Sequence, residues 1–169
     1  MRIYIIGYMG AGKSTVSVRL ARKLGFERFD LDELFELRYK VSVHDFFQKY
    51  GQELFRKFES QLLKETVSID NAVISCGGGT PCFYDNMYWM NQHGLTVYLK
   101  LSHQAIHSRL ILSKKKRPLI AKKNPEELFL FIRNHLRQRN IYYSQAKITV
   151  TGESLNMDQL LKLIKEYQR

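Results

Sequence analysis

The sequence predicts an α/β fold in which helices cover both faces of a five-stranded parallel sheet. Short apolar runs of strand length alternate with amphipathic stretches of helical length, and strands that alternate with helices form parallel sheets. The composition, 169 residues with 44% hydrophobic and 25% charged, suits one compact domain over 1–169. No internal repeat or low-complexity linker divides the sequence.

The strands are expected where apolar residues run together between turns. "IYII" opens the chain, and "AVIS", "TVYLKL" and "KITVT" follow at intervals that leave room for helices. "ERFD" is a weaker candidate, because it carries charges and lies between two helical stretches. The five predicted strands are 3–6, 27–30, 72–75, 96–101 and 147–151.

Helices are expected where apolar residues recur with helical periodicity. The predicted helices are 13–24, 32–50, 52–68, 84–93, 103–112, 125–143 and 156–168. Right-handed crossovers between parallel strands place the carboxyl ends of all strands at one edge of the sheet, where ligands bind in open α/β folds. Catalytic residues are therefore sought at the ends of the strands.

Basic charge is concentrated in one stretch of the chain. The net charge is +11, and "SKKKRPLIAKKN" at 113–124 holds six Lys or Arg and no acid, so the remainder carries only +5. A solvated loop is the simplest interpretation of such a run. Nucleic-acid binding is the alternative, but no aromatic residues are interleaved with the lysines and no nucleic-acid-reading motif accompanies them. We expect no nucleic-acid partner.

Neither a metal cluster nor a membrane segment is indicated. Cys76 and Cys82 have no second pair and no clustered histidines, which favours reduced thiols in a cytosolic protein. The five histidines lack a partner at metal-ligand spacing and are read as surface or helix-face residues. The apolar run before Gly7 is too short for a signal peptide, and no stretch is long enough to span a membrane. We expect a cytoplasmic protein with no membrane partner.

The strongest motif is "GYMGAGKST" at 7–15, which matches G-x-x-x-x-G-K-[ST] between a predicted strand and a predicted helix. Its glycines let backbone N–H groups wrap around phosphates at the positive end of a helix. Lys13 is expected to reach the β and γ phosphates, and the Ser14 hydroxyl to bind Mg²⁺. The nucleotide-binding residues expected from this motif are Gly10, Ala11, Gly12, Lys13, Ser14 and Thr15.

The class of nucleotide-binding protein depends on the remaining motifs. A GTPase would carry N-K-x-D, which the sequence lacks. A motor ATPase normally has a strand that ends in Asp, whereas "AVIS" runs into Cys76 and three glycines. A small-molecule kinase is compatible with these features. A regulatory protein that binds ATP without turnover is disfavoured, because the sequence carries Lys13, Ser14, Asp32, Arg56, Arg117 and Arg139 together.

Two carboxylates follow the second predicted strand in "FDLDE". Asp30 and Asp32 lie two residues apart at a strand end, so both are expected at the catalytic edge of the sheet. We expect Asp30 to hold Mg²⁺ through water and Asp32 to accept a substrate hydroxyl. Capping of the helix that begins at Glu33 is the alternative role for either carboxylate.

Glycines and arginines elsewhere extend the candidate site. "SCGGGTP" at 75–81 ends the third strand with three glycines, which expose backbone N–H groups to a ligand or simply form a flexible turn. Arg56 lies in one amphipathic helix, and Arg137 and Arg139 lie late in another. Each arginine taken singly is typical of a surface position.

Taken together, these stretches resemble the shikimate kinase family along nearly the whole chain. The resemblance rests on "GYMGAGKST", "FDLD", "FRKFE", "CGGGT", "KKRPLI" and "RQRNIYY", in the family's order and at about its spacings. It implies a three-layer P-loop kinase fold like that of nucleoside monophosphate kinases, with a substrate-binding segment at about 31–60 and a mobile lid at about 113–124. It also implies a cytoplasmic monomer that uses Mg²⁺ to transfer the γ-phosphate of ATP to the 3-hydroxyl of shikimate, in chorismate and aromatic amino acid biosynthesis.

The resemblance implies roles on the substrate side. Asp32 resembles the carboxylate beside the attacking hydroxyl and is the candidate base, although phosphoryl transfer needs little help from a base. Arg56 and Arg139 resemble the pair that clamps the substrate carboxylate, and Glu59 resembles the acid that orients Arg56. Backbone contacts to the substrate are implied for Gly77, Gly78 and Gly79.

The resemblance also implies roles on the nucleotide side. Arg109 resembles the arginine that packs on adenine, and Arg117 resembles the lid arginine that moves onto the phosphates of ATP. Ser14 and Asp30 match the residues on the Mg²⁺ side. The implied catalytic residues are Lys13, Asp32 and Arg117. "VTGESLN" departs from the family pattern, and no adenine contact is assigned to it.

The nearest rival function is another small-molecule kinase of this fold, such as a gluconate or nucleoside monophosphate kinase. Two arginines placed for a carboxylate, together with Asp32 for hydroxyls, favour a hydroxylated acid over a nucleotide as the acceptor. A gluconate kinase would be expected to carry a different sequence after the second strand.

Overall fold

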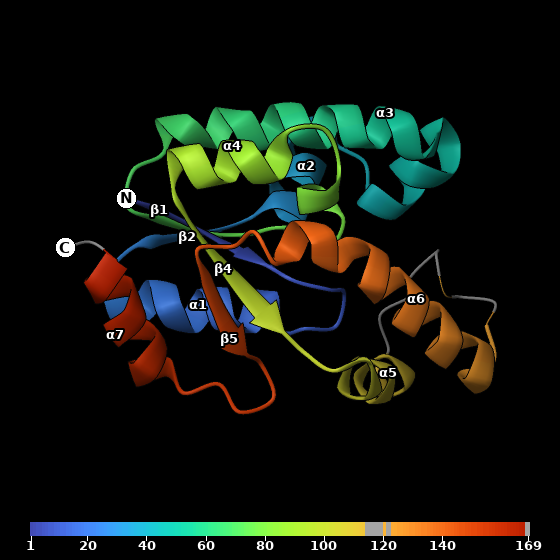
Figure 1. Ribbon diagram of the computed structural model, residues 1–169. Helices are drawn as coiled ribbons and strands as arrows, with labels where there is room; N and C mark the ends of the chain where they lie inside the picture. Colours follow the sequence, from blue (N-terminus) through green and yellow to red (C-terminus); the bar gives the residue numbers. More distant parts are fainter. Residues whose placement is uncertain (114–119, 121–122, 168–169) are drawn as a thin grey trace.

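The computed structural model describes residues 1–113, 120 and 123–167, and these form a three-layer α/β/α domain (Figure 1). The central sheet has five parallel strands in the order β2-β3-β1-β4-β5. The strands are β1 (Arg2–Ile6), β2 (Glu27–Asp30), β3 (Ala72–Ser75), β4 (Leu95–Lys100) and β5 (Ile148–Thr151). All five predicted strands are confirmed, including the charged β2.

Helices cover both faces of this sheet, as the alternating pattern predicts. Figure 1 shows α3 and α4 over one face and α1 and α7 over the other, while α6 runs back from beside α5 toward the sheet. The helices are α1 (Lys13–Leu24), α2 (Leu31–Tyr39), α3 (Val43–Glu65), α4 (Asn86–His93), α5 (His103–Leu112), α6 (Pro125–Tyr143) and α7 (Met157–Tyr167). The predicted bounds of α1, α5 and α6 agree with the structure at both ends.

The predicted helix at 32–50 is wrong, because the chain turns sharply within it. Lys40 adopts a left-handed conformation (φ 55°) that ends α2, and the Ser42 side chain accepts a hydrogen bond from the Asp45 backbone N–H, which begins α3. The predicted break near residue 51 is a kink within α3 instead, at Gly51 (φ 82°). The amphipathic spacing continues unbroken through this turn, so the sequence does not reveal it. A lysine rarely adopts a left-handed conformation, and Lys40 therefore does not mark the end of a helix in the sequence.

The hydrophobic core lies on both sides of β1, β3 and β4. The apolar residues of these strands are buried, and buried strands of this kind are typical of parallel sheets covered on both faces. The carboxyl ends of β1, β2 and β3 lead into the phosphate loop, into α2 and into the three glycines, respectively. The fold therefore brings these three segments to one edge. Along the described part of the chain, no helix has the length and apolarity that a membrane crossing requires.

Candidate active site

The phosphate loop has the geometry that its glycines predict. Gly10 (φ 80°) and Gly12 (φ 91°) adopt conformations that favour glycine, and Gly12 directly precedes α1. The Lys13 ammonium donates to the backbone oxygens of Gly7 and Tyr8, at 2.9 Å each. The loop thus presents backbone N–H groups, a lysine ammonium and a helix N-terminus together, which is a phosphate-binding arrangement.

Ser14 and Asp30 come together from separate segments of the chain. The Ser14 hydroxyl donates to the Asp30 carboxylate at 3.0 Å, and the other oxygen of Asp30 accepts from the Asp32 backbone N–H at 3.1 Å. Asp30 therefore caps α2, one of the two roles considered from the sequence, and it also contacts Ser14 of the phosphate loop, while its part in binding Mg²⁺ stays a prediction. Arg28 also pairs with Asp30 at 3.1 Å.

The two oxygen groups of Ser14 and Asp30 fit a magnesium site. Mg²⁺ is usually held by one or two protein oxygens, while water and substrate phosphates complete the octahedron. Within the described residues no cluster of three or more His, Cys, Asp or Glu forms a protein-only metal cage. The donor set therefore suits a metal that arrives with phosphates.

A cleft of about 360 Å³ opens beside the phosphate loop and collects the predicted substrate residues. The residues that line it include Met9, Ser14, Asp30, Asp32, Arg56, Glu59, Gly77, Gly78, Gly79 and Arg139. They come from α1, β2, α2, α3 and α6 and from the loops that follow β1 and β3. Residues far apart in sequence thus form one concave site, as expected at this edge of the sheet.

Arg56 is buried beside the cleft. An arginine on an amphipathic helix, taken alone, would be expected at the surface. Its side chain donates to the Glu59 carboxylate at 2.7 Å, and the exposed fractions of the two residues are 7% and 2%. The Thr80 hydroxyl donates to the other oxygen of Glu59 at 2.6 Å. Glu59 therefore orients Arg56, and Thr80 in turn holds Glu59, which the sequence did not indicate.

Arg139, rather than its neighbour Arg137, faces the cleft. Arg139 is 6% exposed and its guanidinium lies 5.6 Å from the centre of the Tyr8 ring, whereas Arg137 is exposed. The two residues differ by two positions on α6, so they point to opposite sides of the helix. The structure thus brings Arg56 and Arg139, two guanidinium groups, to the same cleft.

The three glycines allow close approach of backbone to side chains. A Cβ at Gly79 would lie 2.3 Å from an Arg56 nitrogen, and a Cβ at Gly77 would lie 2.9 Å from a Glu59 oxygen. Gly78 packs against the phosphate loop, since a Cβ there would lie 3.1 Å from the Met9 nitrogen. These glycines are required for space rather than for left-handed backbone, as their φ values are not positive.

Tyr143 is a functional neighbour that the sequence did not predict. It is fully buried near the end of α6, and its hydroxyl donates to the Gly78 carbonyl oxygen. Burial raises the pKa of the Tyr143 phenol, so it is a donor at neutral pH. The i, i+4 spacing from Arg139 is the signal that both side chains share one face of α6.

His135 is a helix-face residue of α6, as expected, and it has a hydrogen-bond partner that the sequence did not indicate. Its Nδ1 lies 2.8 Å from the Tyr8 hydroxyl, and the ring packs edge-on against the Tyr8 ring. Burial, together with the positive charges of Arg139 and Arg56, lowers the pKa of His135 to about 4. The ring is therefore neutral at physiological pH.

The nucleotide-side arginines are only partly described. Arg109 donates to the backbone oxygens of Gly10 and Ala11, at 3.4 and 3.1 Å, so it lies over the phosphate loop from α5. Arg117 lies outside the described residues, as does most of the predicted lid at 113–124. Arg109 is thus placed beside the expected nucleotide, and the prediction for Arg117 stays a prediction.

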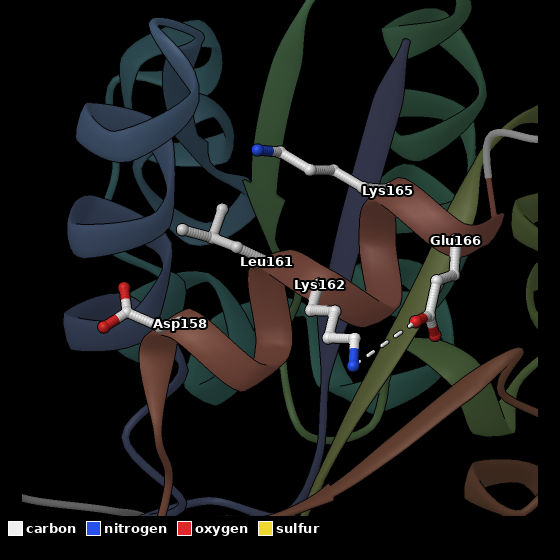
Figure 2. Close-up of a pocket in the computed structure, with 5 residues that line it drawn as sticks. All are labelled: Asp158, Leu161, Lys162, Lys165 and Glu166. Atoms are coloured by element: carbon white, nitrogen blue, oxygen red, sulfur yellow. Dashed lines mark ion pairs between the residues drawn. The ribbon is translucent and has the colours of Figure 1, made fainter.

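Two other hollows lie away from this cleft. Figure 2 shows one on α7, lined by Asp158, Leu161, Lys162, Lys165 and Glu166. Lys162 and Glu166, one turn apart on α7, pair at 3.9 Å. The other lies between the end of β4 and α6, where Lys100, Arg133 and Arg137 are exposed. Of the described residues that line these hollows, none is a predicted site residue.

Comparisons with known proteins agree on one family. A family model described as "SKI: Shikimate kinase" matches residues 9–168. A curated shikimate kinase from Azobacteroides pseudotrichonymphae is 44% identical over 162 residues, which cover 95% of each chain. A crystal structure of shikimate kinase from Bacteroides thetaiotaomicron is 38% identical, with a TM-score of 0.87 over 99% of this chain and 96% of that one. The shikimate kinase from Acinetobacter baumannii in complex with shikimate is 32% identical, with a TM-score of 0.86 over 98% and 93%.

Proposed function

The chain belongs to the shikimate kinase family and has its P-loop kinase fold, and we propose from this premise how its residues act in Mg²⁺-dependent transfer of the ATP γ-phosphate to the 3-hydroxyl of shikimate. The products are ADP and shikimate 3-phosphate. The observation that carries the proposal is the convergence of two buried arginines and Asp32 on a cleft beside the phosphate loop. A hydroxylated carboxylic acid is the acceptor that this set of groups fits.

The arginines bind the substrate carboxylate, and Asp32 binds the reacting hydroxyl. A planar guanidinium matches a carboxylate, and Arg56 is oriented for this by Glu59 at 2.7 Å. The hydroxyl oxygen attacks the γ-phosphorus, the bond to the β–γ bridging oxygen breaks, and the hydroxyl proton passes to the Asp32 carboxylate. The transition state is loose, so positioning by Arg56 and Arg139 contributes more than the basicity of Asp32.

The phosphate loop and its neighbours bind the nucleotide. Backbone N–H groups of Gly10, Ala11, Gly12, Lys13, Ser14 and Thr15 surround the phosphates, and Lys13 moves from its present backbone acceptors onto them. Ser14, and Asp30 through water, would hold Mg²⁺, and a bound Mg²⁺ would supply positive charge to the β and γ phosphates. Arg109 packs on adenine.

Arg117 is assigned to the lid from the sequence alone. A cation that contacts the γ-phosphate stabilises the charge that spreads over the transferring group. We expect Arg117→Ala to lower kcat by several powers of ten with little change in the KM for shikimate. A variant with the turnover of the wild-type chain would remove Arg117 from the lid role.

The wider assignments follow from the family and from composition. The chain acts as a single domain over 1–169, in which about 31–60 binds the acceptor and about 113–124 closes over ATP. It is a cytoplasmic monomer that binds neither nucleic acid nor membranes. Size-exclusion chromatography coupled to light scattering tests the monomer, and a mass of twice 20.0 kDa would contradict it.

A coupled ADP-release assay across four acceptors tests the reaction. Shikimate, gluconate, AMP and CMP are each supplied at the same concentration with ATP and Mg²⁺. We expect ADP release with shikimate and only background release with the other three, because the cleft offers two arginines to a carboxylate. Absence of ADP release with shikimate would overturn the proposed reaction, and selective release with gluconate would replace it.

A further inference from the structure

The side chain of Tyr8 points away from the phosphate loop to which its backbone belongs. Tyr8 follows Gly7 in the loop, yet its side chain is 1% exposed and its hydroxyl lies 2.8 Å from Nδ1 of His135 on α6. The two rings meet edge to face, with their centres 5.5 Å apart. The buried phenol of Tyr8 is thus held against α6.

His135 and Arg139 lie one helical turn apart on the same face of α6. The Tyr8 ring contacts both of them, because the Arg139 guanidinium lies 5.6 Å from its centre. Phe131, one turn before His135, also packs against this histidine, at 4.9 Å between ring centres. The ring of Tyr8 therefore occupies a fixed place beside Arg139.

The backbone of Tyr8 is fixed as well. Its carbonyl oxygen accepts from the Lys13 ammonium at 2.9 Å and from the Ala11 N–H at 3.1 Å. One residue thus contacts the phosphate-binding lysine through its main chain and the substrate-side arginine through its ring.

We propose that Tyr8 and His135 are positioning residues for Arg139, so that their hydrogen bond fixes the guanidinium at the angle at which it receives the substrate carboxylate. The inference rests on the proposed function, which makes Arg139 a carboxylate ligand. A long arginine side chain loses much conformational entropy when it binds a substrate. A ring held in place beside Arg139 restricts its side chain beforehand, so that less entropy is lost when the substrate binds. Neither residue touches the substrate.

Tyr8→Phe tests the proposal, because it keeps the ring and removes only the hydroxyl. A neutral hydrogen bond contributes enough that its loss should raise the shikimate KM by about three- to tenfold. The KM for ATP and kcat should stay within about twofold of the wild-type values. Titration calorimetry with shikimate alone should show the same loss of affinity without turnover.

Tyr4→Phe is the matched control. Tyr4 is a buried tyrosine in β1, and its hydroxyl shares a 3.0 Å hydrogen bond with Thr66 away from the cleft. The chemical change is the same, so both variants should lose similar thermal stability. The shikimate KM of Tyr4→Phe should nevertheless equal that of the wild-type chain.

Substitutions of His135 and Arg139 separate positioning from packing. His135→Leu removes the hydrogen-bond partner of Tyr8, whereas His135→Asn keeps a polar atom near the place of Nδ1 and should restore part of the shikimate affinity. In the Arg139→Ala background, Tyr8→Phe should have no further effect on the shikimate KM, because the group that it positions is gone.

Three results would overturn the inference. They are an unchanged shikimate KM in Tyr8→Phe, an equal rise in the KM for ATP, and a full effect of Tyr8→Phe in the Arg139→Ala background. Failure of the proposed function is distinguishable, since the wild-type chain would then neither bind shikimate in the calorimeter nor release ADP with it.

Discussion

Gly79→Ala displaces Arg56, the arginine proposed to bind the substrate carboxylate, without straining the backbone. Gly79 has φ −93° and ψ −17°, which alanine adopts readily. The added Cβ would lie 2.3 Å from one Arg56 nitrogen and 2.6 Å from its guanidinium carbon. The substitution therefore acts first on Arg56, to which the three nearest atoms belong.

The size of the effect follows from these distances. Ordinary contact begins at 3.4 Å, so a Cβ at 2.3 Å from the nitrogen requires the guanidinium to retreat by 1.1 Å. The guanidinium is the flexible end of its side chain, so we expect Arg56 to move and the fold to remain. A displacement of about 1 Å at a binding group costs on the order of a hundredfold in catalytic efficiency, which corresponds to about 2.7 kcal/mol.

Steady-state kinetics with shikimate and with ATP measure this effect. We expect Gly79→Ala to lower kcat/KM for shikimate about a hundredfold, chiefly through KM, and to leave the KM for ATP unchanged. Gly25→Ala is the control, since a Cβ there meets no atom within 4 Å and only the left-handed φ of 68° is strained. It should cost about 1 kcal/mol of stability and leave the shikimate KM unchanged.

A double-mutant cycle decides whether Arg56 carries the effect. If the clash with Arg56 is the cause, Gly79→Ala should add nothing to the KM increase of Arg56→Ala. Additive effects of the two substitutions would refute the reasoning, and so would a Gly79→Ala enzyme with the shikimate KM of the wild-type chain.

Three further predictions follow from the buried polar groups. Glu59→Gln leaves the Arg56 charge without its ionic partner. Urea denaturation should therefore show that the free energy of unfolding falls by ~3 kcal/mol, and the shikimate KM should rise. Unchanged values of both would contradict the role of Glu59. Tyr143→Phe leaves the Gly78 carbonyl without its donor, so the free energy of unfolding in urea should fall by ~1 to 3 kcal/mol. An unchanged urea midpoint would count against the hydrogen bond between Tyr143 and Gly78. The pKa of His135 falls from 6.5 to about 4 on folding, so its contribution to stability is complete above pH 6.5 and is lost as the pH falls toward 4. Because His135 is only partly buried, the free energy of unfolding should fall by ~1 to 2 kcal/mol between pH 8 and pH 5. His135→Asn should remove this pH dependence.

The sequence by itself determined the features that depend on neighbouring residues. The phosphate loop is nine consecutive residues, and its glycines, Lys13 and Ser14 perform their roles wherever a strand precedes them and a helix follows. Strands such as β4 were evident because parallel strands buried on both faces are apolar throughout. The bounds of α6 were evident because Asn124 and Glu127 form a capping box at its start.

Only the tertiary structure decided which polar side chains meet. Arg137 and Arg139 look equivalent in sequence, and Arg139 enters the cleft because the buried face of α6 is set by packing against α5 and the segment Thr80–Cys82. Tyr8 and His135 are separated by 127 positions, so no periodicity connects them. Local patterns record the conformation that a segment prefers, whereas a contact between distant side chains exists only once the crossovers have placed their elements side by side.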